Sequence, residues 1–271
     1  MENVRKGRDV PLAALTRIGR RLPIKDRGAA VLCYHDIGTD VANTTDYYLS
    51  PDRFRTQLEG IREWGFTFVP FAEIVDRLLA GRDLDGLVAV TFDDALVGVR
   101  DAAAPILAAL GIPATIFVVT DVLGIEPPFW SGAARTLTAD ELTAITATGF
   151  ITLGSHTCTH ASLPDVADEV RARELRDSRV ALIAIGGAPA DLLAYPSGHH
   201  DTETETAAAA AGYRAACTFS FGRVTPTTDP YAIPRFCMHA GQTPFHLARL
   251  LARRPADWQR PLPTDGVTPP E

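Results

Sequence analysis

Short apolar runs alternate with longer amphipathic stretches over most of the chain. The runs at 87–92 (LVAVTF) and 114–119 (ATIFVV) carry no charged side chain, which is typical of strands covered on both faces of a parallel sheet. On this basis we predict strands at 30–34, 66–69, 87–92, 114–119, 150–153, 192–195, 214–219 and 233–237.

The stretches between the runs have helical periodicity and helix-end signals. Glu141 follows Thr138 by three residues, which is a capping box, and Gly111 directly follows an Ala-rich segment. Strands that alternate with helices predict an α/β fold with a mainly parallel sheet. The spacing fits a single (β/α) barrel better than a doubly wound sheet, and no G-x-G-x-x-G motif follows the first strand. The predicted helices are 54–64, 71–79, 99–110, a helix opened by Thr138, 165–185, 202–211 and 244–253.

Composition and charge agree with one globular domain. The chain has 271 residues, of which 46% are hydrophobic and 22% are charged, enough apolar material for a packed core. It contains no run of about 18 apolar residues, so we expect no transmembrane helix. The formal net charge of −7 argues against nucleic acid as a partner.

The two ends differ in character from the predicted barrel at 29–257. Residues 1–28 form a basic arm, in which an amphipathic stretch at 12–22 predicts a surface helix, with a peripheral membrane or partner contact as the alternative. Residues 258–271 form a Pro-rich tail. The four cysteines contain no C-x-x-C pair, so we expect buried, reduced thiols. No apolar signal segment follows the N-terminus, and we therefore expect a cytoplasmic protein.

Polar side chains gather directly after the apolar runs or within the last of them. These side chains are His35, the pair Asp93 and Asp94, the pair His156 and His160, Ser197, and Arg235 in the run IPRFC. In a parallel barrel the carboxyl ends of all strands open onto one face, where active sites are built. We therefore expect these groups to converge although they are far apart in the sequence.

The two aspartates and the two histidines together suggest a metal site. Adjacent carboxylates repel unless a cation lies between them or one is protonated, although a turn or helix-cap pair is the plain alternative. His156 and His160 are spaced i, i+4, so a helical turn would place both rings on one face. With Asp94 they would form a His₂Asp site that leaves room for water, which is typical of a catalytic metal. Cys158 lies between the histidines, and we expect it to point away as a packed thiol.

Several motifs resemble the polysaccharide deacetylases, the metal-dependent carbohydrate esterases of family four. The similarity runs from about residue 31 to residue 253, in the family's order. The combination of Asp-Asp with S-H-T-x-T-H is highly specific. The motifs are TFDDA (91–95), GIPATIFV (111–118), LGSHTCTH (153–160), LLAYPSG (192–198), AAGYRAACTF (210–219) and DPYAIPRF (229–236).

The resemblance implies a distorted (β/α) barrel that hydrolyses the N-acetyl group of an amino sugar, in a polysaccharide, oligosaccharide or glycoconjugate. By analogy, Asp93 is the general base, and the backbone N–H of Ser197 holds the oxyanion. Metal-bound water would attack the amide carbonyl. The implied metal ligands are Asp94, His156 and His160, with zinc the usual ion and Co²⁺, Ni²⁺ or Fe²⁺ also compatible with these donors.

The chain departs from the family pattern at three places. Ala95 stands where glycine usually follows Asp-Asp. Leucines at 192 and 193 stand where many members have an arginine that orients the base, and Arg235 is our candidate replacement, with an ordinary surface or structural ion pair as the alternative. The late Leu-x-His motif that supplies a general acid is not evident. A subgroup with an early Tyr-His motif is more similar, and on that basis we expect His35 to protonate the leaving amine.

Two other functions compete with a deacetylase. A catalytically silent barrel could bind a glycan or a partner protein, and the three departures are compatible with it. A glycosidase could use Asp93 with a distant carboxylic acid, but the histidine pair would then have no role. The retained aspartates and histidines favour the deacetylase, because a binding module needs no activated water.

Overall fold

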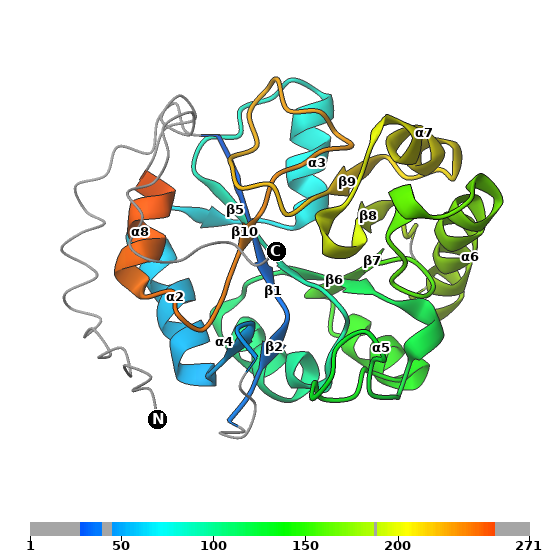
Figure 1. The fold of residues 1–271 in the computed structure, drawn as a ribbon. Helices are drawn as coiled ribbons and strands as arrows, with labels where there is room; N and C mark the ends of the chain where they lie inside the picture. The colour runs from blue at the N-terminus through cyan, green and yellow to red at the C-terminus, as the bar shows by residue number, and fades with distance from the viewer. Residues whose placement is uncertain (1–27, 40–44, 187–188, 253–271) are drawn as a thin grey trace, which may run out of the picture.

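The computed structural model describes residues 28–39, 45–186 and 189–252, which form one α/β domain around a strongly curled parallel sheet (Figure 1). The eight strands of this sheet all pair in parallel, in the order β10-β1-β5-β6-β7-β8-β9, with β4 also beside β5. They are β1 (Ala30–Tyr34), β4 (Thr67–Phe68), β5 (Leu87–Phe92), β6 (Ala114–Val118), β7 (Ile151–Ser155), β8 (Leu192–Ala194), β9 (Ala215–Cys217) and β10 (Phe236–Cys237).

The strand predictions are confirmed, one sheet strand for each predicted run. The last predicted strand is shorter in the structure, because Ile233 makes only an isolated parallel bridge to Cys217 before β10 begins. A small parallel pair, β2 (Asp36–Ile37) and β3 (Tyr48–Leu49), was not predicted. Strands of two residues are too short to show a periodicity in the sequence.

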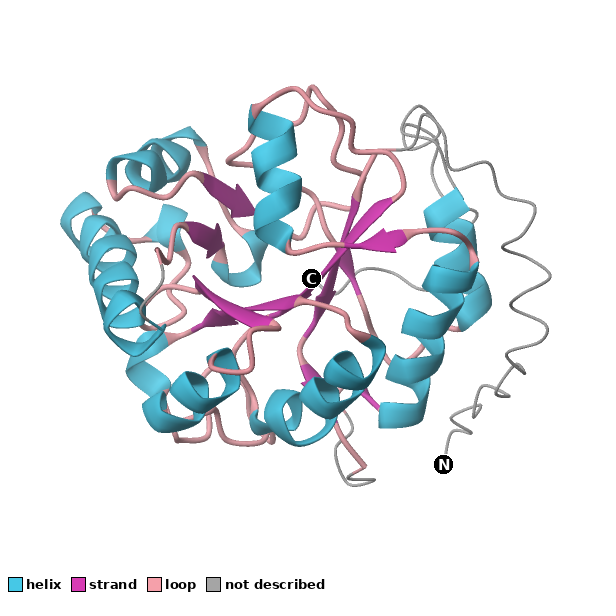
Figure 2. Ribbon diagram, turned by 180° about the vertical axis from the view of Figure 1, so that it is seen from behind, coloured by secondary structure: helices cyan, strands magenta, loops and turns pink. Residues whose placement is uncertain are grey.

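The helices surround the curled sheet (Figures 1 and 2). Ser50 caps α2 by accepting from the backbone N–H of Arg53, and Thr138 and Glu141 form the predicted capping box of α5. The predicted helix at 99–110 begins as a π-helical turn, η1 (Val99–Ala103). The helices are α2 (Pro51–Glu63), α3 (Phe71–Leu79), α4 (Ala104–Leu110), α5 (Ala139–Thr146), α6 (Asp168–Gly186), α7 (Thr202–Ala210) and α8 (Pro244–Ala252).

One helix begins later than predicted, and both ends of the chain lie largely outside the described residues. The helix predicted from residue 165 begins three residues later, at Asp168, because Leu163–Asp165 forms a separate 3-10 turn around Pro164. The basic arm, its amphipathic stretch and the Pro-rich tail lie almost entirely outside the described residues. Within the part of the chain that is described, no helix combines the length and apolar character needed to cross a bilayer.

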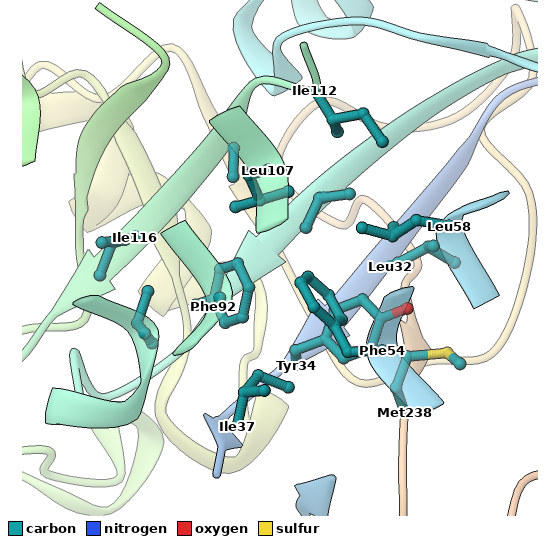
Figure 3. Close-up of a cluster of buried hydrophobic side chains, with 14 of the residues drawn as sticks. Leu32, Tyr34, Ile37, Phe54, Leu58, Phe92, Leu107, Ile112, Ile116 and Met238 are labelled. Carbon is teal, nitrogen blue, oxygen red and sulfur yellow. The ribbon is translucent and has the colours of Figure 1, made fainter. Parts of the chain in front are cut away.

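The core holds the central strands rigidly between the helices. Every residue of β1, β5 and β6 is buried, as their uncharged sequences predict. Tyr34, Phe54 and Phe92 pack as a group of rings between β1, α2 and β5, with the Tyr34 and Phe54 centroids 4.9 Å apart (Figure 3). Close packing of this kind gives the strand ends, where the polar side chains lie, little freedom to move.

Candidate functional site

Except for Ser197, the polar side chains singled out in the sequence come from different strand ends and meet inside the curled sheet. Asp93 and Asp94 follow β5, and His156 follows β7. One ligand atom from each of Asp94, His156 and His160 lies within 4.8 Å of the other two. The Nε2 atoms of His156 and His160 are 3.6 and 3.8 Å from the Asp94 Oδ1 atom. The structure thus brings together the three residues expected to bind a metal.

Hydrogen bonding leaves the histidine and carboxylate atoms of this trio available to an ion. The Nδ1 atom of His156 lies 2.7 Å from the carbonyl oxygen of Ala194, which can only accept, so Nδ1 carries the proton and Nε2 presents its lone pair. The Asp94 Oδ1 atom is buried and has no hydrogen-bond partner among the described residues. An unpartnered buried carboxylate oxygen is costly, and a cation would satisfy it.

Burial shifts the pKa values of all three residues of the trio. It raises the pKa of Asp94 well above its usual value, and the neighbouring charge of Asp93 acts in the same direction. Burial also lowers the pKa of His156, and it lowers that of His160 to about 3. Neutral imidazoles are the form that binds metals, and a divalent ion would favour the ionised Asp94.

The loop that carries the two histidines is not the helical turn that the i, i+4 spacing suggested. Residues 156–160 are irregular, and Thr157 and His160 have positive φ angles of 67° and 65°. These angles fold the loop back so that the two rings come within 4.9 Å, centroid to centroid. The Thr157 hydroxyl accepts from the backbone N–H of His160 at 3.1 Å, which supports the fold of the loop. Asp94 and Ala95, at φ 67° and 56°, show the same left-handed backbone, which is the conformation that favours glycine at position 95.

A buried glutamate that the sequence analysis missed holds this loop in place. The Oε2 atom of Glu174, on α6, accepts from the backbone N–H groups of Cys158 and Thr159 at 2.8 and 2.9 Å. Its Oε1 atom accepts from the Thr159 hydroxyl at 2.9 Å. The feature of the sequence that could have indicated this role is the position of Glu174 next to Leu175, in a helix rich in charged residues. The Cys158 thiol, as expected, packs away from the trio, 3.5 Å from the Glu174 carbonyl oxygen.

Replacing Glu174 should weaken metal binding without any change in the ligands themselves. In Glu174→Ala the two N–H groups lose their acceptor, and we expect metal affinity to fall by about 10–100-fold, the range for outer partners of ligands. Glu174→Gln, which keeps one acceptor oxygen, should be intermediate. Competition with a chromogenic chelator measures the affinity, and Glu169→Ala, at an exposed position on the same helix, is the control. Equal affinity for Glu174→Ala and Glu169→Ala would contradict this.

Asp93 is paired with the arginine proposed from the sequence. Arg235 donates from its two terminal nitrogens to Asp93 Oδ1 and Oδ2, both at 2.7 Å, and both side chains are fully buried. A surface ion pair is therefore excluded, and Arg235 lies in the interior, directly before β10. Burial alone would raise the pKa of Asp93, but the Arg235 charge and hydrogen bonds outweigh it and hold that pKa well below its usual range. Asp93 is thus ionised at neutral pH.

His35 lies among aromatic rings beside the trio. Its ring centroid is 4.7 Å from that of Tyr47, 5.3 Å from Trp130 and 6.0 Å from Phe219, and the ring of Phe129 stacks on His160 at 4.0 Å. Burial lowers the pKa of His35 to about 4. Its Nδ1 atom has no hydrogen-bond partner in the described part of the chain. The half-buried rings of Tyr47, Phe129, Trp130 and Phe219 are called the aromatic rim below.

Ser197 lies at the end of β8, in the turn Pro196–Gly198. Its φ of 54° is again left-handed, and its side chain is exposed. Tyr195, just before it, is fully buried and stacks on His200. It therefore belongs to the core, whereas Trp130 remains partly accessible.

Comparison with known proteins identifies relatives of this fold and sequence. Residues 80–216, just over half of the chain, match the family model described as polysaccharide deacetylase. YxkH of Bacillus subtilis (strain 168), by name a candidate polysaccharide deacetylase, is 23% identical over 214 residues, which cover 79% of this chain and 72% of YxkH. The solved structure of the Streptococcus pyogenes deacetylase PplD in complex with acetate aligns with a TM-score of 0.73 and 24% identity, over 84% of this chain and 99% of PplD. IcaB from Ammonifex degensii aligns with a TM-score of 0.72 and 25% identity, over 84% of this chain and 98% of IcaB.

Proposed function

The chain belongs to the polysaccharide deacetylase family, and we propose that it is a metal-dependent hydrolase that removes an N-acetyl group from an amino sugar. One observation carries the proposal. The Asp94, His156 and His160 trio lies beside Asp93, with the His156 Nε2 atom 3.9 Å from Asp93 Oδ2, and Asp93 is held ionised by Arg235. A ligand trio next to an oriented carboxylate is the arrangement needed to hydrolyse an unreactive amide.

The residues present fit a divalent metal. The donor set is two neutral imidazoles and one carboxylate, and the unpartnered Asp94 Oδ1 atom faces both Nε2 atoms. These donors suit zinc, and also Co²⁺, Ni²⁺ or Fe²⁺. When bound, the ion would supply Lewis-acid polarisation of the acetamide carbonyl and would lower the pKa of water. We propose zinc as the physiological ion, because these donors suit it and it is the usual ion of the family.

Asp93 would accept the proton from the attacking water. Its two hydrogen bonds with Arg235 fix the direction of the carboxylate, and its low pKa keeps it ionised at neutral pH. Arg235 is thus a positioning residue that acts through Asp93. The backbone N–H of Ser197, in the turn after β8, is our candidate donor to the oxyanion that forms at the carbonyl.

His35 is our candidate for protonating the leaving amine. Its ring is neutral near pH 7, so it must first take up a proton, and the charge of Asp93 favours that protonated form. In His35→Ala we therefore expect amide hydrolysis to fall by about 100-fold or more, the lower range for acid–base groups. Hydrolysis of an activated acetate ester should be retained, because a good leaving group needs no proton. Equal losses on the two substrates would argue against this role.

The aromatic rim supports a carbohydrate substrate. Pyranose rings present apolar C–H faces, and partly exposed aromatic side chains bind such faces while also contributing hydrophobic area. In Trp130→Ala we expect KM for a glycan substrate to rise by about tenfold with little change in kcat, since losing about 1.4 kcal/mol of apolar contact lowers affinity tenfold. Phe150→Ala, at an exposed ring before β7 and outside the rim, is the control. An unchanged KM would remove this support.

A screen of N-acetylated sugars with the metal-loaded protein tests the whole proposal. Polymer, oligosaccharide and glycoconjugate substrates would be compared by acetate release, with metal-free protein and Asp93→Asn as controls. We expect Asp93→Asn to bind metal as the wild type does and to lose about 10²–10⁴-fold in rate. A protein that binds the metal but releases no acetate from any class would instead favour a silent glycan-binding barrel.

A further inference from the structure

A second group of side chains that could bind a metal lies inside the curled sheet, and it shares no residue with the Asp94 trio. Cys33 is in β1, His35 follows the end of β1, and Cys237 is in the neighbouring strand β10 (Figure 1). Cys33 and Cys237 are direct partners in the parallel register. One ligand atom from each of the three residues lies within 4.8 Å of the other two.

The geometry of the cluster follows from the two strands. Side chains two apart on a strand point to the same side, so Cys33 and His35 face together, and the register places the Cys237 thiol beside that of Cys33. A tetrahedral ion with bonds of about 2.3 Å to sulfur and about 2.0 Å to nitrogen holds its ligand atoms roughly 3.5–3.8 Å apart. The three atoms therefore need to close by no more than about 1.3 Å, within the reach of side-chain motion.

One polar atom of the cluster is unsatisfied without an ion. The Nδ1 atom of His35 is buried and has no hydrogen-bond partner among residues 28–39, 45–186 and 189–252. The Cys33 thiol donates to Asp93 Oδ2 at 3.4 Å and also makes a side-chain hydrogen bond with Cys237. Two sulfurs and one imidazole form a soft donor set, whereas the Asp94 trio contains no sulfur.

We propose that Cys33, His35 and Cys237 form a second metal site, selective for a thiophilic ion such as Cd²⁺ or Cu⁺, and that its occupation inhibits the enzyme. Binding replaces the two S–H bonds with sulfur–metal bonds and releases both protons to solvent. The bound ion would occupy a ring nitrogen of His35 and would draw the Cys33 sulfur away from Asp93. Only the inhibitory part rests on the proposed function, because metal binding itself requires no catalysis.

Cobalt spectroscopy of the reduced, full-length protein tests the site directly. Thiolate-to-Co²⁺ charge transfer absorbs in the near ultraviolet, and only a site with sulfur can produce it. We expect one equivalent of this absorption in the wild type and in His156→Ala, where the Asp94 trio is disabled. It should be lost in Cys33→Ser and in Cys237→Ser, and retained in Cys158→Ser and Cys217→Ser.

The two control cysteines match the two in the cluster. Cys158 and Cys217 are also buried, but each donates to a backbone carbonyl, at 3.5 and 3.4 Å, and neither belongs to a cluster of ligand atoms among the residues that the structure describes. Circular dichroism checks each variant, and Cys237, only half-buried, is the more tolerant position if Cys33→Ser fails to fold. Absence of the charge-transfer band in the wild type, or its persistence in both cluster variants, would overturn the proposal. So would a count below four free thiols in the protein before reduction, which would indicate a disulfide.

Inhibition is measured separately with Cd²⁺ added to the zinc-loaded protein. We expect Cys237→Ser to need at least about tenfold more Cd²⁺ than the wild type for half-inhibition, because it lacks one of the three ligands. Equal sensitivity of the two proteins would overturn the inhibitory part. If no substrate is found, inhibition cannot be measured, and the cobalt result alone decides whether the second metal site exists. Failure of the proposed function and failure of the second site are therefore distinguishable.

Discussion

His156→Ala is expected to lose the metal at the Asp94 trio and, with it, essentially all of the proposed deacetylase activity. The imidazole is 1% exposed, its Nδ1 atom is committed to the Ala194 carbonyl oxygen, and its Nε2 atom is 3.6 Å from Asp94 Oδ1. Removing it leaves one imidazole and one carboxylate, which is too few ligands to retain an ion against water. We expect metal affinity to fall by more than about 100-fold, beyond the range for outer partners of ligands.

The control for this variant is His199→Ala. His199 is exposed and lies in the segment after the Ser197 turn, with its Nδ1 atom 3.4 Å from the Ser162 hydroxyl. It should keep wild-type metal content, measured by elemental analysis after dialysis against a weak chelator. A His156→Ala protein that is folded and carries a full equivalent of zinc at the Asp94 trio would show that His156 is not a ligand.

The strands and the convergence of the site were predictable from short stretches of sequence. Runs such as 87–92 contain no charge because both faces of β5 are covered, and that requirement is visible residue by residue. Polar residues that follow such runs fall at strand ends, which a parallel sheet brings to one face. This is why Asp93 and Asp94, which follow β5, could be placed beside His156, which follows β7.

The parts that were not predictable depend on tertiary contacts or on backbone angles. The i, i+4 spacing of His156 and His160 suggested a helix, but the loop uses left-handed residues at Thr157 and His160 instead. Nothing near Glu174 in the sequence shows that its carboxylate reaches a loop 15–16 residues earlier. The aromatic rim combines Tyr47 with rings from distant loops, and single aromatic residues carry no periodic signal.

Arg235 was predictable from the sequence only in part. It became a candidate because the usual arginine is replaced by leucines at 192 and 193, so a substitute for its positive charge was sought elsewhere. Its pairing with Asp93 spans 142 residues and requires both side chains to reach the interior of the curled sheet. The residue type was therefore predictable. Its complete burial and its two hydrogen bonds with the Asp93 carboxylate follow only from the fold.

Replacing Arg235 with leucine is expected to destabilise the protein by about 3–5 kcal/mol, the usual cost of removing one partner from a buried ion pair. The ionised Asp93 carboxylate would lose both 2.7 Å hydrogen bonds and remain fully buried without a countercharge. Urea unfolding of the metal-free protein measures the change. Arg214→Leu is the matched control, since Arg214 is partly exposed and pairs with Asp76 and Asp191, and it should cost less than about 1 kcal/mol.

A double-mutant cycle separates the pair from general packing damage. In Asp93→Leu with Arg235→Leu, no buried charge is left unpaired, and replacing both partners of a buried pair is often nearly neutral. We therefore expect the double variant to be more stable than Arg235→Leu alone, with a coupling energy of about 2 kcal/mol or more, within the range for residues in contact. Additive losses would mean that the two side chains act independently. The arginine could then not be what holds Asp93 ionised and correctly directed at the site.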